Sequence, residues 1–180
     1  DPEKFHIKED RDNFDYIYSI DDLRELRGTK FETKRNMVNR FSRFHSSTSI
    51  NTIDLADFSN QKLLNDLVEQ WVIYKSDDLS NFEHENELRA IKKLLKNISS
   101  LELFSTGIMS EGELLAFSIN EVLPNGYAIS HFVKAVTGHT GVYDFLMKAD
   151  VNRLADASVR FLDYEQDLGI SELRYSKNSF

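Results

Sequence analysis

The densest group of chemistry-bearing side chains lies near the end of the chain. Asp163, Glu165 and Asp167 stand at alternate positions, directly after an apolar run that predicts a strand. Carboxylates at the end of a strand could bind an amine or orient a nucleophile. Arg174 and Lys177 follow on one face of a predicted helix, where they could bind phosphate or stabilise an oxyanion. Arg174 and Lys177 could instead pair with Glu165 and Asp167 as a structural network.

A second candidate site is a loop with two glycines, Gly138 and Gly141, ahead of a predicted helix that begins near Tyr143. Glycine permits a close backbone approach, and the N-terminus of a helix attracts phosphate or carboxylate groups. The alternative is a turn that binds no ligand. On the preceding predicted strand, strict alternation puts His131 on one face and Lys134 on the other.

Basic residues are concentrated in one stretch of an acidic chain. Between Arg27 and Arg43 the sequence has six basic residues and one acid, although the formal charge of the whole chain is −8. This asymmetry predicts a basic face for a phosphate-bearing partner, and the alternative is a solvated helix face. The acidic remainder argues against non-specific nucleic-acid binding, which depends on clustered Lys and Arg.

Several common kinds of site are absent from the sequence. The chain has no cysteine, which excludes a disulfide framework, a thiolate zinc site and a cysteine nucleophile. No two histidines have helical metal-ligand spacing, so no metal is expected. The glycine motifs of hydrolases, kinases and dehydrogenases do not occur. No apolar run approaches the roughly 18 residues that span a bilayer, and we expect a cytoplasmic protein or one at the cytoplasmic face of a membrane.

Hydrophobic spacing predicts helices in the first half of the chain and mainly strands in the second. Ser19 is a predicted N-cap, Gly28 a predicted helix stop, Glu111-Gly112 a hairpin turn and 76–82 a loop. The predicted helices are 21–27, 29 or 33 to 44, 60–74, 83–98, 143–155 and 171–177, and the predicted strands are 16–18, 49–55, 103–109, 113–121, 127–136 and 159–164. Three antiparallel strands, a helix and a returning strand predict a single α+β domain.

Two motifs at opposite ends of the chain resemble the DUF2156 family, a relative of the soluble domain of phosphatidylglycerol lysyltransferase. The first combines Tyr16-Ile17-Tyr18-Ser19 with Lys34-Arg35-Asn36-Met37-Val38-Asn39-Arg40-Phe41, and the second extends from Glu165 to Lys177. The resemblance implies a GNAT-like fold of class α+β, with a mixed, mainly antiparallel central sheet and helices on both faces. It also implies that residues 1–180 form one domain, the second module of a tandem protein.

The resemblance further implies an acyltransferase or aminoacyltransferase module. The expected donor is aminoacyl-tRNA, the expected acceptor is a phospholipid or a peptidoglycan precursor, and no tightly bound cofactor is expected. Lys177 or Arg174 would stabilise the developing oxyanion, and Glu165 or Asp167 would hold the α-ammonium of the donor. Substrate or phosphate contacts are expected from ten further residues: Lys34, Arg35, Asn36, Asn39, Arg40, His131, Lys134, Gly138, Gly141 and Tyr143. The expected partners are tRNA or an anionic headgroup, and an upstream GNAT-like module.

Other functions stay open at this point. A CoA-dependent N-acetyltransferase shares the implied fold, but its loop needs a basic residue where Gly138 stands and a small one where Tyr143 stands. Acetyl-CoA is therefore the less favoured donor. Another alternative is a non-catalytic GNAT-like module that binds a phosphate-bearing ligand. The basic and acidic motifs at the two ends could also pair with each other only to close the fold.

Overall fold

The computed structural model describes residues 6–75 and 81–180. Its centre is a six-stranded sheet with the strand order β1-β6-β5-β4-β3-β2. The strands are β1 (Ile17–Ser19), β2 (Thr48–Asn51), β3 (Phe104–Ser110), β4 (Glu113–Val122), β5 (Tyr127–Ala135) and β6 (Phe161–Asp163). The α-helices described are α1 (Ile20–Glu25), α2 (Glu32–Phe44), α3 (Phe58–Lys75), α4 (Asn81–Lys96), α5 (Val142–Asp156) and α6 (Ser171–Asn178).

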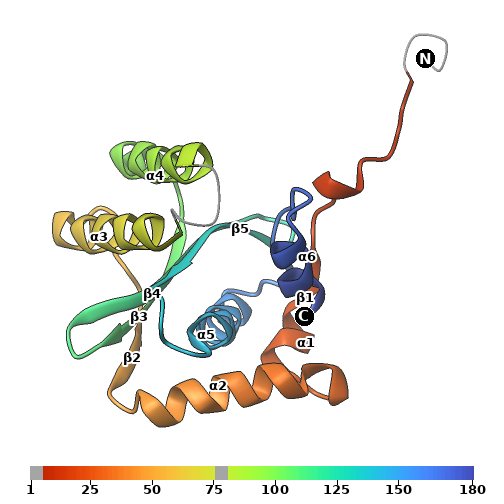
Figure 1. Ribbon diagram of the computed structural model, residues 1–180, viewed down its shortest axis with the longest axis horizontal. Coiled ribbons are helices and arrows are strands. Elements are labelled where there is room, and N and C mark those ends of the chain that lie inside the picture. Colours follow the sequence, from red (N-terminus) through yellow and green to blue (C-terminus); the bar gives the residue numbers. More distant parts are fainter. Residues whose placement is uncertain (1–5, 76–80) are drawn as a thin grey trace.

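Helices cover both faces of the sheet (Figure 1). α3 and α4 lie on one face, and α1, α2 and α5 lie on the other. All neighbouring strands are antiparallel except β5 and β6, which run parallel because α5 connects them as a crossover helix. This arrangement confirms the predicted α+β class, the mainly antiparallel sheet and the helices on both faces.

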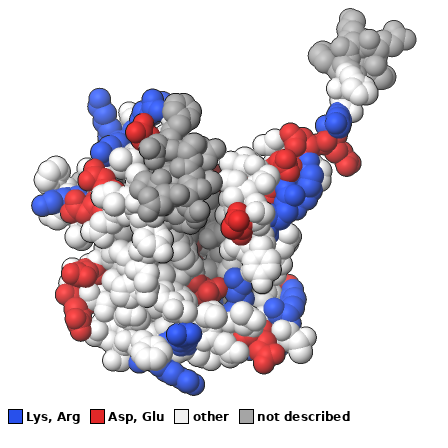
Figure 2. Space-filling model, viewed as in Figure 1, with Lys and Arg blue, Asp and Glu red and all other residues white. Residues whose placement is uncertain are grey.

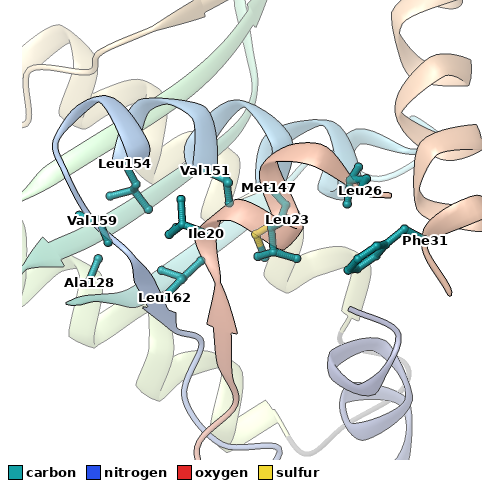
Figure 3. Close-up of a cluster of buried hydrophobic side chains, with 10 residues drawn as sticks. All are labelled: Ile20, Leu23, Leu26, Phe31, Ala128, Met147, Val151, Leu154, Val159 and Leu162. Atoms are coloured by element: carbon teal, nitrogen blue, oxygen red, sulfur yellow. The ribbon is translucent and has the colours of Figure 1, made fainter. Parts of the chain in front are cut away.

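Packing between α1 and α5 closes one face of the sheet (Figure 3). The buried cluster contains Ile20 and Leu23 of α1, Met147, Val151 and Leu154 of α5, and Ala128 and Leu162 of the sheet. Fully burying one aliphatic side chain of this size contributes about 1.5–3 kcal/mol. The cluster therefore fixes α5 firmly against β5 and β6 at the end where these two strands are paired.

Some predicted element boundaries shift in the structure. Ser19 caps α1 as predicted, by accepting a backbone hydrogen bond at 3.3 Å. The helix ends at Leu26, which takes the left-handed conformation, so the prediction that Gly28 stops it is wrong. α2 begins without a side-chain cap, and neither Thr29 nor Thr33 serves as one. These differences lie at helix ends, where local capping signals compete. Two strands are also shorter than predicted, since β2 ends at Asn51 instead of residue 55 and β6 begins at Phe161 instead of residue 159.

The predicted hairpin turn between β3 and β4 is confirmed. Glu111 and Gly112 have φ angles of 52° and 87°, which match the twist of the flanking strands. Of the predicted loop at 76–82, residues 76–80 lie outside the described residues, and Asn81 already begins α4. None of the helices in the two described ranges is long and apolar enough to cross a membrane.

A β-bulge in β5 interrupts the predicted alternation of its side chains. Ile119 of β4 pairs with Phe132, but the next residue, Asn120, pairs with Ser130, so His131 is an extra residue in the ladder. Bulges re-aim a side chain and increase the local twist of a strand. The prediction of unbroken alternation through His131 is therefore wrong, because the bulge changes the direction of the His131 side chain from the one that alternation predicts.

The loop between β5 and α5 packs closely against α2 through Gly141. This glycine has a φ of 86°, and a Cβ added to it would lie 2.3 Å from the carbonyl oxygen of Met37. Gly138 has a similar φ of 91°, but a Cβ there would meet nothing within 4 Å. Contact with α2 thus explains why the chain has glycine at position 141.

We expect Gly141→Ala to destabilise the fold by about 3 kcal/mol or more, because it adds a backbone collision to left-handed strain. Gly138→Ala is the matched control and should lose only about 1–2 kcal/mol, the cost of the left-handed conformation. Urea unfolding of the two variants measures the difference. Equal losses would contradict the close contact between Gly141 and α2.

Candidate functional site

The parallel strands β5 and β6 stay paired over a very short length. Tyr127–Ile129 pairs with Phe161–Asp163, whereas β5 continues to Ala135. The two segments separate at a place that we call the strand fork. Residues 164–169 leave β6 at this place, and we call them the site loop. In open sheets ligands bind where neighbouring strands part.

His131 bridges the strand fork with both ring nitrogens. Nδ1 lies 3.3 Å from Oε1 of Glu165 in the site loop, and Nε2 lies 3.1 Å from Oε2 of Glu121 on β4. The hydrogen bond with Glu165 is the main cause of a raised His131 pKa; partial burial opposes the shift and Glu121 adds to it. All three side chains are partly exposed. A partly exposed imidazole can take up a proton and give it back, which is the chemistry of a general base and acid.

The site loop that presents Glu165 is strained and heavily bonded. Glu165 and Leu168 have φ angles of 57° and 53°, in the left-handed region that costs non-glycine residues about 1–2 kcal/mol each. The backbone N–H of Glu165 donates to Asp163 Oδ1 at 2.8 Å, and its carbonyl accepts from the N–H of Tyr16 at 3.2 Å. These bonds fix the backbone from which the Glu165 side chain reaches across the fork.

Lys177 supports the site loop from α6. Its buried ammonium donates to the carbonyl oxygen of Tyr164 and, at 2.8 Å, to that of Gln166. Burial lowers the pKa of Lys177, and nearby carboxylates, Glu165 first, act against that shift. The loop thus takes two of the three N–H donors. The predicted role of Lys177 as an oxyanion stabiliser stays a prediction.

Asp167 is fully buried and surrounded by hydrogen-bond donors. Arg174 binds it through two nitrogens at 2.8 and 2.7 Å, Tyr16 donates its hydroxyl proton at 2.6 Å, and Arg11 lies at 3.3 Å. The backbone N–H of Gly169 adds a bond at 2.9 Å. These bonds, those from Arg174 foremost, hold the pKa of Asp167 well below its usual range.

Asp167 is enclosed, whereas Glu165, the other carboxylate predicted to hold the donor, is not. The carboxylate of Asp167 has no exposed surface for the α-ammonium of a donor, whereas Glu165 is partly exposed. Arg174 is occupied as well, because it also donates to Asp12 Oδ1 at 2.6 Å. Asp167 and Arg174 therefore form the structural network that the sequence left open as an alternative, and their predicted part in catalysis stays a prediction.

The basic motif is held by contacts with α5, with the C-terminal Phe180 and with the turn that follows α1. Lys34 pairs with Asp144 at 3.0 Å, and its ammonium lies 3.7 Å from the centre of the Phe180 ring. Arg35 donates to two backbone carbonyls that follow α1, that of Gly28 at 2.7 Å among them. Among the described residues, neither cation pairs with a carboxylate of the second motif. The basic residues therefore do not pair with the acidic motif, and the contacts between the two motifs come from Tyr16, which bonds Asp167, and Tyr18, which donates to the carbonyl of Lys177.

The other candidates of the basic motif are spread over the surface. Asn36, Asn39 and Arg40 are exposed on α2. In the face drawn in Figure 2, acidic and basic side chains are interspersed rather than gathered in one basic patch. The solvated helix face, which the sequence kept as an alternative, agrees with this arrangement, and phosphate binding by these three residues stays a prediction.

Lys134 lies on the α3–α4 side of β5. Its nearly buried ammonium contacts the carboxylate of Glu87 on α4 and lies 4.3 Å from the ring centre of Trp71 on α3. Tyr143 is hydrogen-bonded to the Trp71 side chain and to the backbone of Ala135, and burial raises its pKa. The structure thus ties Lys134 and Tyr143 into contacts between the sheet and its helices.

The first turn of α5 carries its own charge pair. Gly141 is the N-cap and has no side chain to cap the helix. Asp144 stands in the first turn, where the helix dipole favours a carboxylate, and Lys34 neutralises it. An anion arriving at this helix end would meet both charges. Phosphate binding by Gly138, Gly141 and Tyr143 stays a prediction.

Two further polar clusters lie outside the strand fork. His45 Nε2 and His139 Nδ1 are 3.1 Å apart and join α2 to the loop before α5. Asp150 of α5 is buried and accepts hydrogen bonds from Thr106 at 2.6 Å and from Asn120 at 3.0 and 3.1 Å, and burial raises its pKa. In the described part of the chain, no three side chains are grouped so that they could hold a metal ion.

Three residues that the structure places at the site were not assigned to it from the sequence. Glu121 contacts His131, and Tyr16 and Arg11 bond Asp167 of the site loop. Glu121 stands at the end of a predicted strand, and the pairing of β4 with β5 places it beside His131. A charged residue at a strand end, one hairpin away from a strand histidine, is the signal that could have found it. Arg11 lies in a polar stretch without periodicity, so no local signal marks it.

A GNAT fold is the class that this sheet and its helices define. The PaiA N-acetyltransferase of Thermoplasma acidophilum, solved in complex with coenzyme A, matches this chain with a TM-score of 0.53 at 16% identity. The match covers 73% of this chain and 88% of the acetyltransferase. At this identity the likeness shows the fold alone.

The chain belongs to the family described as phosphatidylglycerol lysyltransferase, C-terminal, which matches residues 3–180 and confirms the resemblance to DUF2156. A conserved protein of unknown function from Bacteroides thetaiotaomicron is 29% identical, with a TM-score of 0.84 over 96% of this chain and 56% of its own. L-PGS from Bacillus licheniformis is 14% identical, with a TM-score of 0.61 over 89% and 49%. The chain thus spans about half the length of these proteins. No curated protein matches it.

We expect Asp167→Asn to lower the thermal stability at pH 7 and to weaken its dependence on acid pH. The folded-state pKa of Asp167 lies below the unfolded one, so its contribution is complete above about pH 5 and is lost as the pH falls through the folded pKa. The variant lacks this ionisation. Its Tm should therefore fall less than that of the wild type between about pH 5 and pH 2.

Circular dichroism melting over this pH range measures the effect of Asp167→Asn. Asp156→Asn is the control, because Asp156 is exposed at the end of α5. If the Asp167 variant loses stability in acid as steeply as the wild type, the carboxylate is not the anchor that its contacts indicate.

Proposed function

We propose that the chain is an aminoacyltransferase module that uses aminoacyl-tRNA as donor and the headgroup of a phospholipid as acceptor. The observation that carries the proposal is His131 held between two partly exposed carboxylates, Glu165 and Glu121, at the strand fork. The family description, which names phosphatidylglycerol lysyltransferase, supports this acceptor class over a peptidoglycan precursor.

Glu165 and Glu121 give the donor a place to bind. An aminoacyl ester carries a positive α-ammonium one carbon away from its reactive carbonyl. Two partly exposed carboxylates at one site attract that charge more strongly than a single exposed one does. Since His131 lies between them, an ammonium bound to either would bring the ester carbonyl close to the imidazole.

The transfer itself needs one proton relay and no covalent bond to the protein. The acceptor hydroxyl oxygen bonds to the ester carbonyl carbon, and the bond from that carbon to the ribose oxygen breaks. In neutral His131 one ring nitrogen keeps its N–H on a carboxylate, and the other takes the proton of the acceptor hydroxyl and returns it to the leaving ribose oxygen. Because the ester is already activated, alignment and exclusion of water supply the remaining acceleration.

Acetyl-CoA is the alternative donor, since an N-acetyltransferase with the same fold was solved with coenzyme A. A pyrophosphate would bind at the N-terminus of the crossover helix. In this chain that turn carries the bulky Tyr143 and the carboxylate of Asp144, whose pairing with Lys34 removes the attraction of the cation for a second anion. These residues favour the aminoacyl donor.

We expect His131→Gln to reduce transfer by about 100-fold or more, the usual contribution of a general base. Glu165→Gln should chiefly raise the KM for the donor, because it removes the partner of the ammonium. The measurement is transfer of a radiolabelled aminoacyl group from tRNA to vesicles that contain phosphatidylglycerol, with the complete protein.

Glu113→Gln is the matched control for the carboxylate, because Glu113 is exposed at the far end of β4. Full activity of both His131→Gln and Glu165→Gln would overturn the assignment of the site. A wild-type protein that binds tRNA and transfers nothing would favour the non-catalytic module.

Isothermal calorimetry separates the two donors. We expect no heat of binding with acetyl-CoA or with CoA, checked at two temperatures so that a zero enthalpy cannot hide binding. A Kd in the micromolar range would show that the first turn of α5 accepts a pyrophosphate. That result would favour the CoA-dependent N-acetyltransferase over the aminoacyltransferase.

A further inference from the structure

The segment that precedes β1, residues 10–16, is bonded to the backbone of the site loop; we call it the N-terminal segment. The N–H of Tyr164 donates to the carbonyl of Tyr16 at 2.9 Å, and the N–H of Tyr16 donates to Glu165 at 3.2 Å. The N–H of Leu168 donates to the carbonyl of Asp12 at 2.9 Å. In Figure 1 this segment runs beside α6 at the other end of the chain.

Side chains of the N-terminal segment hold the same loop through Asp167. Arg11 reaches Asp167 at 3.3 Å and donates to the hydroxyl oxygen of Tyr16 at 2.8 Å, while that hydroxyl donates to Asp167. Asp12 accepts from Arg174, which binds Asp167 with its other donors. The buried carboxylate of Asp167 thus accepts hydrogen bonds both from the N-terminal segment and from α6.

A loop of this conformation needs such support. Two of its non-glycine residues, Glu165 and Leu168, are left-handed, and Gly169 adds a third positive φ of 76°. Strained conformations of this kind persist only where the surroundings over-determine them. Within the described residues, the N-terminal segment makes three backbone–backbone hydrogen bonds with the site loop, which tie Tyr164 and Glu165 to Tyr16 and Leu168 to Asp12.

We infer that Arg11 and Asp12 are positioning residues of the candidate site: through Asp167 and Arg174 they hold the site loop in the conformation that places Glu165 on His131. Neither residue reaches the strand fork itself. A molecule or a protein segment that displaced the N-terminal segment would release Glu165 without touching His131. The inference rests on the location of the proposed site and not on the identity of its donor or acceptor.

The test uses His131 as its own reporter and needs no substrate. Two charged groups face this imidazole, Glu165 from the site loop and Glu121 from β4. Titration of the imidazole by NMR, with the signal assigned through His131→Gln, gives its pKa. In the double variant Arg11→Ala/Asp12→Ala this pKa should fall toward 6.5, because the bond that contributes most to its elevation is lost.

The variant Glu165→Gln removes the carboxylate that contacts His131, and so it gives the full size of the expected change in the His131 pKa. The double variant Arg43→Ala/Asp156→Ala is the matched control, since it removes the same two charges at exposed positions outside the network. Dispersed methyl signals from the α1–α5 cluster show that each variant is folded, and the two single variants replace the double variant if it does not fold.

A folded double variant with an unchanged His131 pKa would overturn the inference. So would an unchanged pKa in Glu165→Gln, because the contact would then be absent. Both results concern only the position of Glu165. A failure of the transfer assay alongside a positive titration would instead count against the proposed function.

Discussion

The early separation of β5 from β6 is the constraint on which the candidate site depends. The two strands part after Ile129 and Asp163, and the bulge that frees His131 begins at the following residue. Packing of α1 and α5 holds the paired end closed. Side chains from β4, β5 and the site loop can meet beyond it, because within residues 6–75 and 81–180 no strand pairs there with the edge of β5 that faces away from β4.

A segment that leaves the sheet also leaves its ladder of hydrogen bonds and must find others. In the site loop, the carboxylate of Asp167 is bonded to Arg174, Tyr16, Arg11 and Gly169. The ammonium of Lys177 donates hydrogen bonds to two backbone carbonyls of the same loop. A buried charge is tolerated when its hydrogen-bonding capacity is satisfied in this way. The same contacts that keep the loop folded therefore set where Glu165 stands.

Most of the charged candidates are bound to partners within the fold. Each of three cations, Lys34, Lys134 and Arg174, pairs with a carboxylate from another part of the fold. These pairs neutralise the charges that would otherwise attract an anionic ligand. His131, Glu165 and Glu121 differ, because all three members of their cluster are partly exposed, whereas each of those ion pairs has at least one member that is mostly covered. This contrast is why the proposed chemistry is placed at the strand fork in a GNAT fold of the phosphatidylglycerol lysyltransferase C-terminal family.

The sequence by itself determined the element order, the hairpin at Glu111-Gly112, the α+β class and the family, because hydrophobic spacing, turn residues and motifs are local signals. It also marked His131 and Glu165 by residue type. Only the tertiary structure decided that Glu121 joins them and that Asp167 is enclosed instead of available. The hydroxyl that binds Asp167 belongs to Tyr16, 151 residues away. Burial and charge partners at that separation follow from how the elements pack, which no local pattern encodes.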